Sequence, residues 1–273
     1  MMTNKYNKSM PYGTYSLKGY DRILLETAQK LKKNWFNFKL ALALRNLVTY
    51  RRNYIIDADV MGIKCRFYPH DNLADRFILF TPKFYDPCEF DMLPKILSSD
   101  SVFIDIGANV GFYSLWASKF ITNSGKIIAI EPNPKIFKRL IENISLNQKE
   151  DTITALQVGV ADIEKEFTLR IINQKNLGGS TILESDYECE SITISCRPLI
   201  SILHDEKVNK IDVLKIDIEG AEHIVLNTFF QNAPQSLFPK ILIIETDENV
   251  PLADFGYKLV KKTEAENSIW ELR

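Results

Sequence analysis

Short apolar runs alternate with segments of helical periodicity from residue 101 to the end of the chain. Five of these runs have the length of buried strands and lie at residues 102–104, 126–130, 153–158, 213–216 and 241–244. Between them, apolar residues recur at spacings of three and four, as in Phe112, Leu115 and Trp116. Because alternating strands and helices are typical of a parallel sheet covered by helices, we predict an α/β domain over residues 101–273.

Further local signals predict the elements that surround this sheet. Asn133 and Pro134 are favoured residue types at a helix start. The buried face of that helix is expected to comprise Ile136, Phe137, Leu140, Ile141 and Ile144. Other helices are expected at residues 88–97, at 199–204 and from about 221. Additional strands are expected at 167–171 and 192–196, and an antiparallel C-terminal hairpin at 257–260 and 269–272.

The N-terminal part of the chain has a different pattern. A single helix is predicted over residues 21–50, with a heptad-type stripe of Leu24, Ala28, Leu31, Trp35, Phe38 and Leu42. This stripe must be buried, either on the body of the protein or against a second copy. Strands, which could form a hairpin, are expected at 54–56 and 62–67, and loop and strand at 69–86. We therefore predict three parts: a basic helical extension at 1–55, a small β/α lead-in at 56–100, and the α/β domain.

Composition limits the class of protein. The chain has 273 residues, of which 45% are hydrophobic and 25% charged, as in ordinary globular proteins. Its four cysteines contain no C-x-x-C pair, which argues against a zinc site or a disulfide framework and for a reducing compartment. There is no signal-like apolar start and no uncharged run of membrane-spanning length. We expect a cytoplasmic protein.

Charge is unevenly distributed along the chain. Residues 1–53 hold 11 basic and two acidic residues, a net charge of +9, whereas the whole chain has a net charge of −1. A basic flank indicates an anionic partner, namely a membrane surface, a phosphorylated acceptor or nucleic acid, or else a helix that docks on the acidic body of the same protein. Nucleic acid is disfavoured because the basic residues match no recognised binding motif. A homodimer through the N-terminal stripe stays open.

The first predicted strand leads into a glycine turn. Asp105 ends the strand, Gly107 and Gly111 lie in the turn, and a helix follows directly. Backbone can approach a ligand closely where no Cβ intervenes, so the turn is either a cofactor pocket or a tight turn without ligand. The spacing D-x-G-x-x-x-G lacks the second glycine of the dinucleotide motif, with Asn109 in its place. It suits S-adenosylmethionine, a cofactor without pyrophosphate.

Acidic residues follow nearly every predicted strand of the parallel sheet. In such sheets ligands bind at the carboxyl ends of the strands. Asp105 could face the ammonium group of S-adenosylmethionine, and Glu131 and Asp162 the ribose and adenine. The predicted cofactor-binding residues are Asp105, Gly107, Asn109, Gly111, Glu131, Asn133 and Asp162.

The fourth strand of the parallel sheet contributes the candidate catalytic residues. Lys215, Asp217 and Glu219 alternate and share one face of the strand. A lysine in a central strand needs a partner, so these residues form either a structural ion pair or a catalytic group. Asp217 and Glu219 are candidate general bases, and His223 is a third candidate or a packing residue. Carboxylates here, with Glu245, could bind Mg²⁺, but nothing in the sequence fixes their convergence, so no metal site is predicted.

These motifs together resemble the FkbM family of S-adenosylmethionine-dependent methyltransferases. The resemblance is carried by residues 103–114, 130–134, 143–147, 213–222 and 244–245, and covers about residue 60 to the C-terminus. It implies a Rossmann-like class I methyltransferase fold, S-adenosylmethionine as donor, and O-methylation of a sugar, glycan or small natural product. The segment 197–201 departs from the family, since Leu199 and Ile200 stand where a Leu-Asp pair is expected.

Two other functions compete with methyl transfer. An NAD-dependent oxidoreductase would use a similar fold, although the missing second glycine argues against it. A non-catalytic scaffold on the same fold would use its basic N-terminal helix to hold a partner. Binding of S-adenosylmethionine against NAD separates the two enzymes, and turnover to S-adenosylhomocysteine excludes the scaffold.

Overall fold

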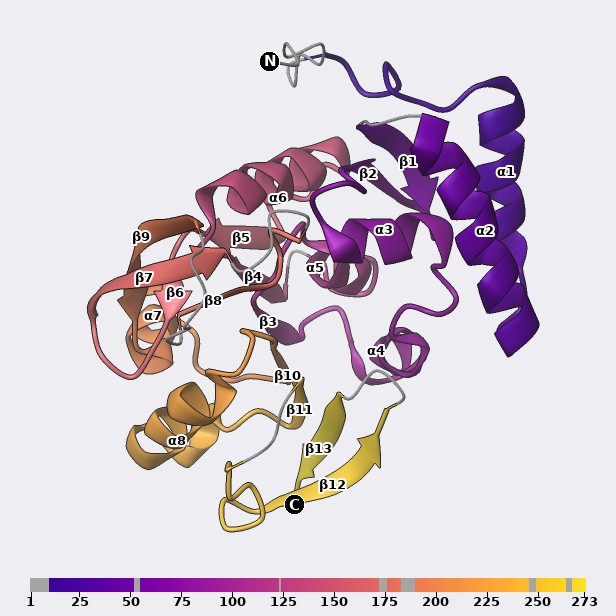
Figure 1. The fold of residues 1–273 in the computed structure, drawn as a ribbon. Coiled ribbons are helices and arrows are strands. Elements are labelled where there is room, and N and C mark those ends of the chain that lie inside the picture. The colour runs from indigo at the N-terminus through magenta and orange to yellow at the C-terminus, as the bar shows by residue number, and fades with distance from the viewer. Residues whose placement is uncertain are drawn as a thin grey trace. The chain divides into compact units, whose positions relative to one another are not determined.

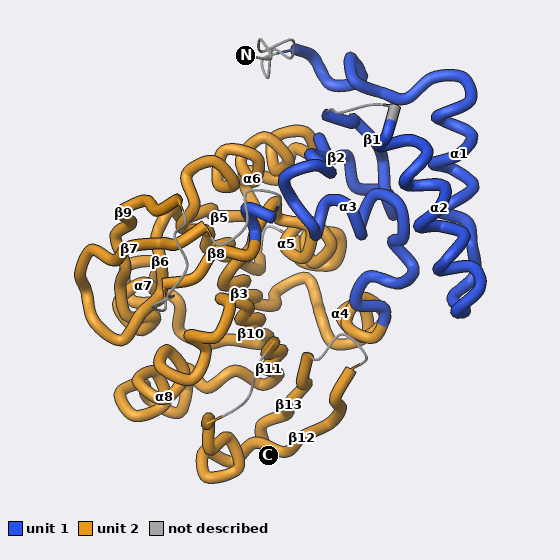
Figure 2. The backbone as a smooth tube through the Cα atoms, viewed as in Figure 1, with its two compact units in different colours: residues 1–87, 175–178 blue, residues 88–174, 179–273 orange. Residues whose placement is uncertain are grey.

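The computed structural model describes residues 10–51, 55–122, 124–171, 176–182, 190–245, 249–263 and 267–273. The chain forms two compact units, which Figure 2 shows in different colours. Unit 1 comprises residues 1–87 and 175–178, and unit 2 comprises 88–174 and 179–273. The three-part division expected from the sequence places its boundaries elsewhere, at 55/56 and 100/101, and stays a prediction.

Unit 1 combines three helices with a two-stranded hairpin (Figure 1). The helices are α1 (Gly19–Lys30), α2 (Trp35–Arg51) and α3 (Leu73–Phe80), and the strands are β1 (Ile56–Val60) and β2 (Ile63–Phe67). The strands pair antiparallel, so the predicted hairpin is present, but its first strand lies at 56–60 and not at 54–56, of which residue 54 is outside the described residues. Helix α1 packs on α2. A buried ion pair between Arg66 and Asp57, at 2.8 Å, ties the two strands together.

The prediction of one helix over residues 21–50 is wrong, because the chain breaks between α1 and α2. Asn34 causes the second start: its side chain accepts a hydrogen bond from the Asn37 backbone N–H at 2.8 Å, as an N-cap does. The heptad stripe is therefore divided. Leu24 and Ala28 are buried on α1, whereas Trp35 is 75% exposed at the start of α2.

The prediction of loop and strand over residues 69–86 is also wrong, since α3 lies there. The Asn72 side chain caps α3 by accepting a hydrogen bond from the Asp75 backbone N–H at 3.2 Å. Asn followed three residues later by an acid is a helix-start signal that the sequence contained. The apolar run at residues 77–80 hid it, because a short run of this kind does not separate strand from helix.

Unit 2 is built on a seven-stranded sheet. Its strands are β3 (Val102–Ile106), β4 (Lys126–Ile130), β5 (Ile153–Leu156), β10 (Val213–Ile216), β11 (Ile241–Ile244), β12 (Tyr257–Lys262) and β13 (Ser268–Leu272). The order is β12-β13-β11-β10-β3-β4-β5. The pairs from β11 to β5 are parallel, and β13 and β12 are antiparallel. The predicted Rossmann-like class I fold with a reversed C-terminal hairpin is confirmed. The predicted turn of the hairpin falls partly on residues 264–266, outside the described residues.

Helices complete unit 2. They are α4 (Pro87–Ile96), α5 (Phe112–Ala117), α6 (Pro134–Leu146), α7 (Leu199–Asp205) and α8 (Glu222–Asn232), with a 3₁₀ turn at Gln235–Leu237. The Asn133 side chain caps α6 as predicted, by accepting from the Lys135 backbone N–H at 3.0 Å. Ile141, expected on the buried face of α6, is exposed instead, because the helix buries a narrower stripe that includes Arg139 and Asn143.

The two faces of the seven-stranded sheet differ in chemistry. One face contributes Ile104, Ile106, Leu214 and Ile216 to a core that includes residues of α7 and α8. Because side chains alternate along a strand, Asp105 and Lys215 point to the other face, and the two residues are register partners on β3 and β10. This face therefore carries the polar groups of the candidate site.

A second, four-stranded sheet has the order β6-β9-β7-β8. Its strands are β6 (Gly159–Val160), β7 (Lys165–Ile171), β8 (Ser180–Thr181) and β9 (Glu190–Arg197). The predicted strands at 167–171 and 192–196 lie in β7 and β9 and pair antiparallel around a small core with Leu169, Ile194 and Cys196.

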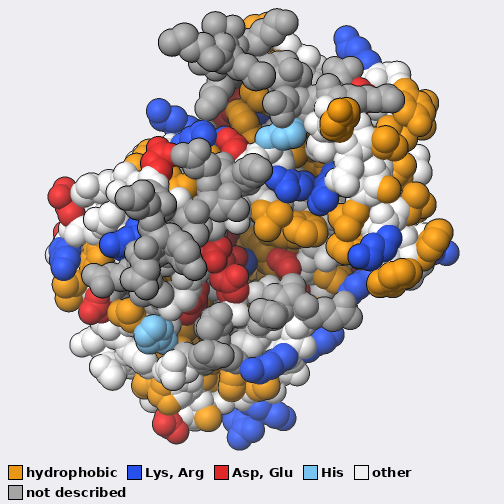
Figure 3. Space-filling view, in the orientation of Figure 1, with side chains coloured by type: hydrophobic (Ala, Val, Ile, Leu, Met, Phe, Trp, Pro, Cys, Tyr) orange, Lys and Arg blue, Asp and Glu red, His pale blue; other side chains and the backbone are white. Residues whose placement is uncertain are grey.

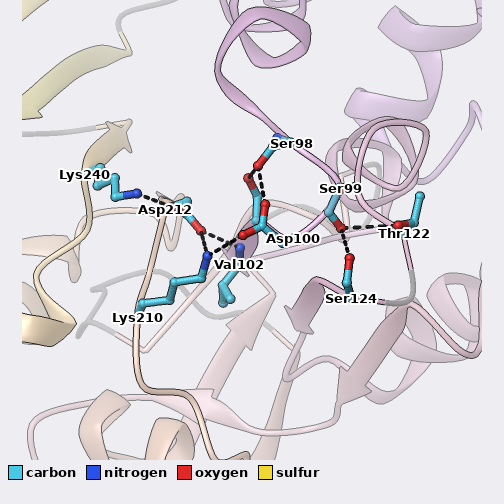
Figure 4. A network of polar contacts seen from close by, with 10 residues as sticks. Ser98, Ser99, Asp100, Val102, Thr122, Ser124, Lys210, Asp212 and Lys240 are labelled. Carbon is cyan, nitrogen blue, oxygen red and sulfur yellow. Dashed lines mark hydrogen bonds and ion pairs between the residues drawn. The ribbon is translucent and has the colours of Figure 1, made fainter.

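A polar network holds the amino ends of three sheet strands (Figure 4). The Asp212 carboxylate accepts a hydrogen bond from the Val102 backbone N–H at 2.8 Å and pairs with Lys240 at 2.7 Å and Lys210 at 3.4 Å. Lys210 also pairs with Asp100 at 3.2 Å. The network joins the segments that lead into β3, β10 and β11.

Among the described helices, none combines the length and the hydropathy that crossing a membrane requires.

Candidate functional site

Asp105 lies at the carboxyl end of β3 with one oxygen unpaired. Its Oδ2 accepts a hydrogen bond from the Ser114 hydroxyl of α5 at 2.6 Å. Its Oδ1 is buried and has no hydrogen-bond partner among the described residues. Burial raises the pKa of this carboxyl group, although Lys215 opposes the shift. A buried carboxylate oxygen without a donor is costly, so it indicates a position where a bound group supplies the donor.

The turn after β3 needs glycine at residue 107. Gly107 has a φ of +76°, and a Cβ at this position would overlap the carbonyl oxygen of Asp217. Gly111 also has a positive φ, of +86°, and a Cβ there would meet Leu140. Asn109 takes the same left-handed region with a φ of +50°. The turn therefore brings β3 and the end of β10 together at backbone distance.

Glu131 organises the end of β4 rather than pointing freely outward. Its two oxygens accept hydrogen bonds from the backbone N–H groups of Asn109, at 3.0 Å, and Asn133, at 2.8 Å. Burial raises its pKa to about 7, against these hydrogen bonds. Glu131 thus links the glycine turn to the start of α6. Asn133 acts through its cap of α6, which positions this segment.

Asp162 stands apart from the other predicted cofactor residues. It is exposed and follows β6 of the four-stranded sheet, not β5. No hydrogen bond among the described residues joins it to Glu131. Its assignment to the cofactor stays a prediction.

Lys215 is paired with Asp217 at the end of β10. Its Nζ lies 2.9 Å from Asp217 Oδ2 and 4.8 Å from the centre of the Tyr113 ring. Lys215 is 4% exposed, so the ammonium needs these partners. Burial opposes ionisation of Asp217, but the charge and hydrogen bond of Lys215 outweigh it and lower the pKa of Asp217. Asp217 is therefore ionised at neutral pH.

Two further carboxylates converge on Asp217. Asp217, Glu219 and Glu245 each offer an oxygen within 4.8 Å of the others. Burial and the charge of Asp217 raise the pKa of Glu245 to about 9, so Glu245 keeps its proton at neutral pH and can donate a hydrogen bond to Asp217. Although Glu219 is exposed, partial burial of its carboxyl group and the charges of Asp217 and Glu222 raise its pKa to about 7. The tertiary structure thus supplies the convergence that the sequence left open.

His223 lies in the first turn of α8. Its Nδ1 is 3.2 Å from the carbonyl oxygen of Gly220, so this ring nitrogen faces the backbone. The neighbouring Glu222 is buried and accepts a hydrogen bond from the Ile218 backbone N–H at 2.7 Å. Sequence reasoning did not assign Glu222 or Ser114 a role. A glutamate four residues after Ile218 at a helix start was the available signal for Glu222, whereas nothing local indicated Ser114.

The residues present fit S-adenosylmethionine. Asp105 offers an unpaired buried oxygen, which suits an ammonium donor. Gly107 and Gly111 let the turn fold tightly against Asp217 and Leu140, which keeps the turn next to Asp105 at the strand end. This combination of an acid, a glycine turn and a following helix lies at the carboxyl ends of parallel strands, where such sheets bind ligands.

The fold and this site define a Rossmann-like methyltransferase. The family model described as "Methyltransferase FkbM domain" matches residues 105–256, which is more than half of the chain. The chain therefore belongs to the FkbM methyltransferase family, and S-adenosylmethionine is its cofactor.

Several individual proteins resemble this chain in sequence or in fold. Methyltransferase sdnD of Sordaria araneosa is 27% identical over 63% of this chain and 74% of its own length. Hexuronic acid methyltransferase AglP of Haloferax volcanii is 27% identical over 66% of this chain and 70% of its own. The crystal structure of the methyltransferase FkbM from Methylobacillus flagellatus shares 14% identity and a TM-score of 0.43, over 85% of this chain and 60% of that one.

Proposed function

We propose that this methyltransferase transfers the methyl group to a hydroxyl oxygen of a sugar, a glycan or a small natural product. The observation that carries the proposal is the convergence of Asp217, Glu219 and Glu245 next to the glycine turn. Oxygen nucleophiles need a proton acceptor, and carboxylates of this kind can serve. The name of the hexuronic acid methyltransferase supports a sugar acceptor.

Asp105, Gly107, Asn109 and Gly111 would hold the cofactor. In this proposal the free Oδ1 of Asp105 accepts from the cofactor ammonium, and Glu131 keeps the turn in place through Asn109. When bound, S-adenosylmethionine supplies an electrophilic methyl group on a sulfonium. Transfer forms the carbon–oxygen bond to the acceptor and breaks the carbon–sulfur bond, whose electron pair stays on sulfur.

Glu219 is the general base we favour among the candidates. A general base works best when its pKa lies near the operating pH, and the pKa of Glu219 is about 7. Asp217 is a weaker base because Lys215 lowers its pKa. In our proposal Glu219 accepts the hydroxyl proton, while Asp217 and Lys215 fix the geometry and charge around it. His223 stays a rival candidate for the proton.

The test is turnover of S-adenosylmethionine to S-adenosylhomocysteine with a panel of acceptors. The panel contains hexuronic acid glycosides, neutral glycosides and phenolic compounds, and mass spectrometry locates the added methyl group. An oxygen-bound methyl on a sugar supports the proposal. Methylation at carbon or nitrogen, or cofactor binding without turnover on any acceptor, would contradict it. Calorimetry with NAD checks the oxidoreductase alternative, for which we expect no binding.

We further propose the cytoplasm as the location of the enzyme. The described cysteines Cys65, Cys88 and Cys196 are free thiols, which suits a reducing compartment. Cell fractionation with an antibody against the full chain tests this, and recovery in the secreted fraction would contradict it.

A further inference from the structure

Helix α2 exposes an apolar stripe to solvent. Its members follow helical spacing on one face: Phe36, Leu40, Ala43, Leu47 and Tyr50, and we call this set the α2 stripe. Phe36 is 69% and Tyr50 95% exposed, and Trp35 beside them is 75% exposed. The opposite side of α2 contributes the fully buried Ala41 and Val48. The helix is thus apolar on two faces, of which the rest of the chain buries one.

Only positive charge accompanies the stripe. No acidic residue occurs between Glu26 and Asp57, while this interval contains the basic residues Lys30, Lys32, Lys33, Lys39, Arg45, Arg51 and Arg52. Lys39 lies on α2 itself, with its ammonium 5.9 Å from the centre of the Trp35 ring. Figure 3 shows hydrophobic and basic side chains side by side over α1 and α2. The segment from Thr27 to Ile56 therefore combines an apolar helix face with basic residues only.

The stripe differs from the exposed apolar residues elsewhere. Among the described residues of unit 2, the exposed large apolar ones are Ile141 of α6, Ile163 after β6, and the adjacent Leu259 and Val260 of β12, and none of these elements carries a stripe of four or more. Scattered apolar residues of this kind are normal on a protein surface, whereas a contiguous set on one helix face marks an interaction site. A partner that binds the α2 stripe must offer apolar groups at the contact and carry negative charge around them.

We propose that α2 docks this enzyme on an anionic lipid membrane, with the α2 stripe at the acyl boundary and the lysines at the headgroups. An interfacial helix has this composition: aromatic and aliphatic residues on one face and Lys or Arg around it. Trp35 and Tyr50 stand at the two ends of α2, and these residue types favour the membrane–water interface. A second copy fits less well, because the segment between Glu26 and Asp57 offers no carboxylate to pair with the basic residues of the other copy.

Membrane docking has a direct test with the full chain and lipid vesicles. We compare sedimentation with vesicles of phosphatidylcholine alone and with added phosphatidylglycerol. We expect binding that requires phosphatidylglycerol and weakens at high salt, because surface charge attraction is screened. Trp35 reports insertion: its fluorescence should shift to the blue, and Trp35→Phe should reduce the shift while binding persists.

Paired variants separate the apolar and the charged contributions. Phe36→Ser with Leu40→Ser should weaken binding to anionic vesicles by roughly tenfold or more. The reason is that the polar serine side chains do not insert at the acyl boundary, so the apolar burial of Phe36 and Leu40 is lost. Lys32→Gln with Lys33→Gln should weaken it by about thirtyfold without changing the low affinity for neutral vesicles. The matched control is Ile141→Ser with Ile163→Ser on unit 2, which should bind as the wild type does. All of these positions are exposed, so thermal unfolding should be unchanged.

Three results would overturn the proposal. They are binding to neutral and anionic vesicles alike, absence of binding to either, and a stable dimer in light scattering that the Phe36→Ser, Leu40→Ser variant abolishes. Turnover on a soluble acceptor should be equal in all these variants and the wild type. A loss of docking is therefore distinguishable from a failure of the proposed methyl transfer.

Discussion

The two ends of the seven-stranded sheet treat carboxylates in opposite ways. At the amino end, Asp212 is held by the Val102 backbone N–H and by Lys240 and Lys210, and although burial opposes it, this pairing lowers the pKa of Asp212. At the carboxyl end, one lysine, Lys215, faces several acids, and the pKa values of most of them are raised.

This contrast separates charges that stabilise the fold from charges that do not. A paired, hydrogen-bonded carboxylate adds stability, whereas a buried carboxylate without a cation costs free energy. Acids with raised pKa values gathered at the ligand-binding end of a sheet are typical of functional sites. We expect substitutions at the two ends to change different quantities.

The largest expected effect is at Asp105. Asp105→Ala removes the proposed partner of the cofactor ammonium, so calorimetry should detect no binding of S-adenosylmethionine. Asp105→Asn keeps the shape and a partner for Ser114 but lacks the charge, and should bind roughly 10- to 100-fold more weakly. Circular dichroism confirms that both variants are folded. Binding of the alanine variant with wild-type affinity would remove Asp105 from the cofactor site.

Glu219 should control turnover without controlling cofactor affinity. Glu219→Gln cannot accept the proton, so kcat should fall by roughly 10²–10⁴-fold while the affinity for S-adenosylmethionine stays the same. The wild-type rate should rise with pH through about 7 as Glu219 ionises. Asp217→Asn removes a charge that raises the pKa of Glu219, so it should move this rise to lower pH. A pH profile of Glu219→Gln equal to that of the wild type would shift the role to His223.

Ionisation of Glu131 should lower the free energy of unfolding as the pH rises. Its pKa is about 7 in the folded protein and 4.5 as the ordinary value, so between these values the folded state binds more protons than the unfolded state. Stability without cofactor should therefore decrease from about pH 4.5 to 7, by on the order of 3 kcal/mol from this group. Glu131→Gln should flatten this slope in urea unfolding. An unchanged slope would mean that Glu131 is ionised throughout.

Asp212 should show the opposite pH dependence and the smallest effect. The pKa of Asp212 is lower in the folded than in the unfolded state. Its contribution to the free energy of unfolding is therefore fully present above the unfolded-state pKa and is lost as the pH falls through the folded-state pKa. Asp212→Ala should cost about 2 kcal/mol at pH 7 by leaving the Val102 N–H unpaired, and Asp212→Asn about 1 kcal/mol, because the amide oxygen still accepts. Cofactor affinity should not change in either variant. A loss of cofactor binding would show that the two ends are coupled.

Local sequence patterns were sufficient for most of the sheet and for the glycine turn. The apolar runs at β4, β10 and β11 match the observed strands because a run of buried residues directly reflects strand burial. Gly107 was recognisable because few residues tolerate its backbone conformation. The helix break at Asn34 and the helix at 73–80 were missed, since capping competes with periodicity and decides only when the chain packs.

What the sequence determined by itself is the alternation of the five parallel strands with helices and the turn that suits S-adenosylmethionine, because periodicity and glycine content act over a few residues. Only the tertiary structure decided that Glu245 lies beside Asp217, that Glu131 accepts a hydrogen bond from the backbone of Asn109, and that Ser114 donates a hydrogen bond to one oxygen of Asp105. These contacts join residues from 9 to 28 positions apart. Their protonation depends on burial and on neighbouring charges, which no local pattern contains.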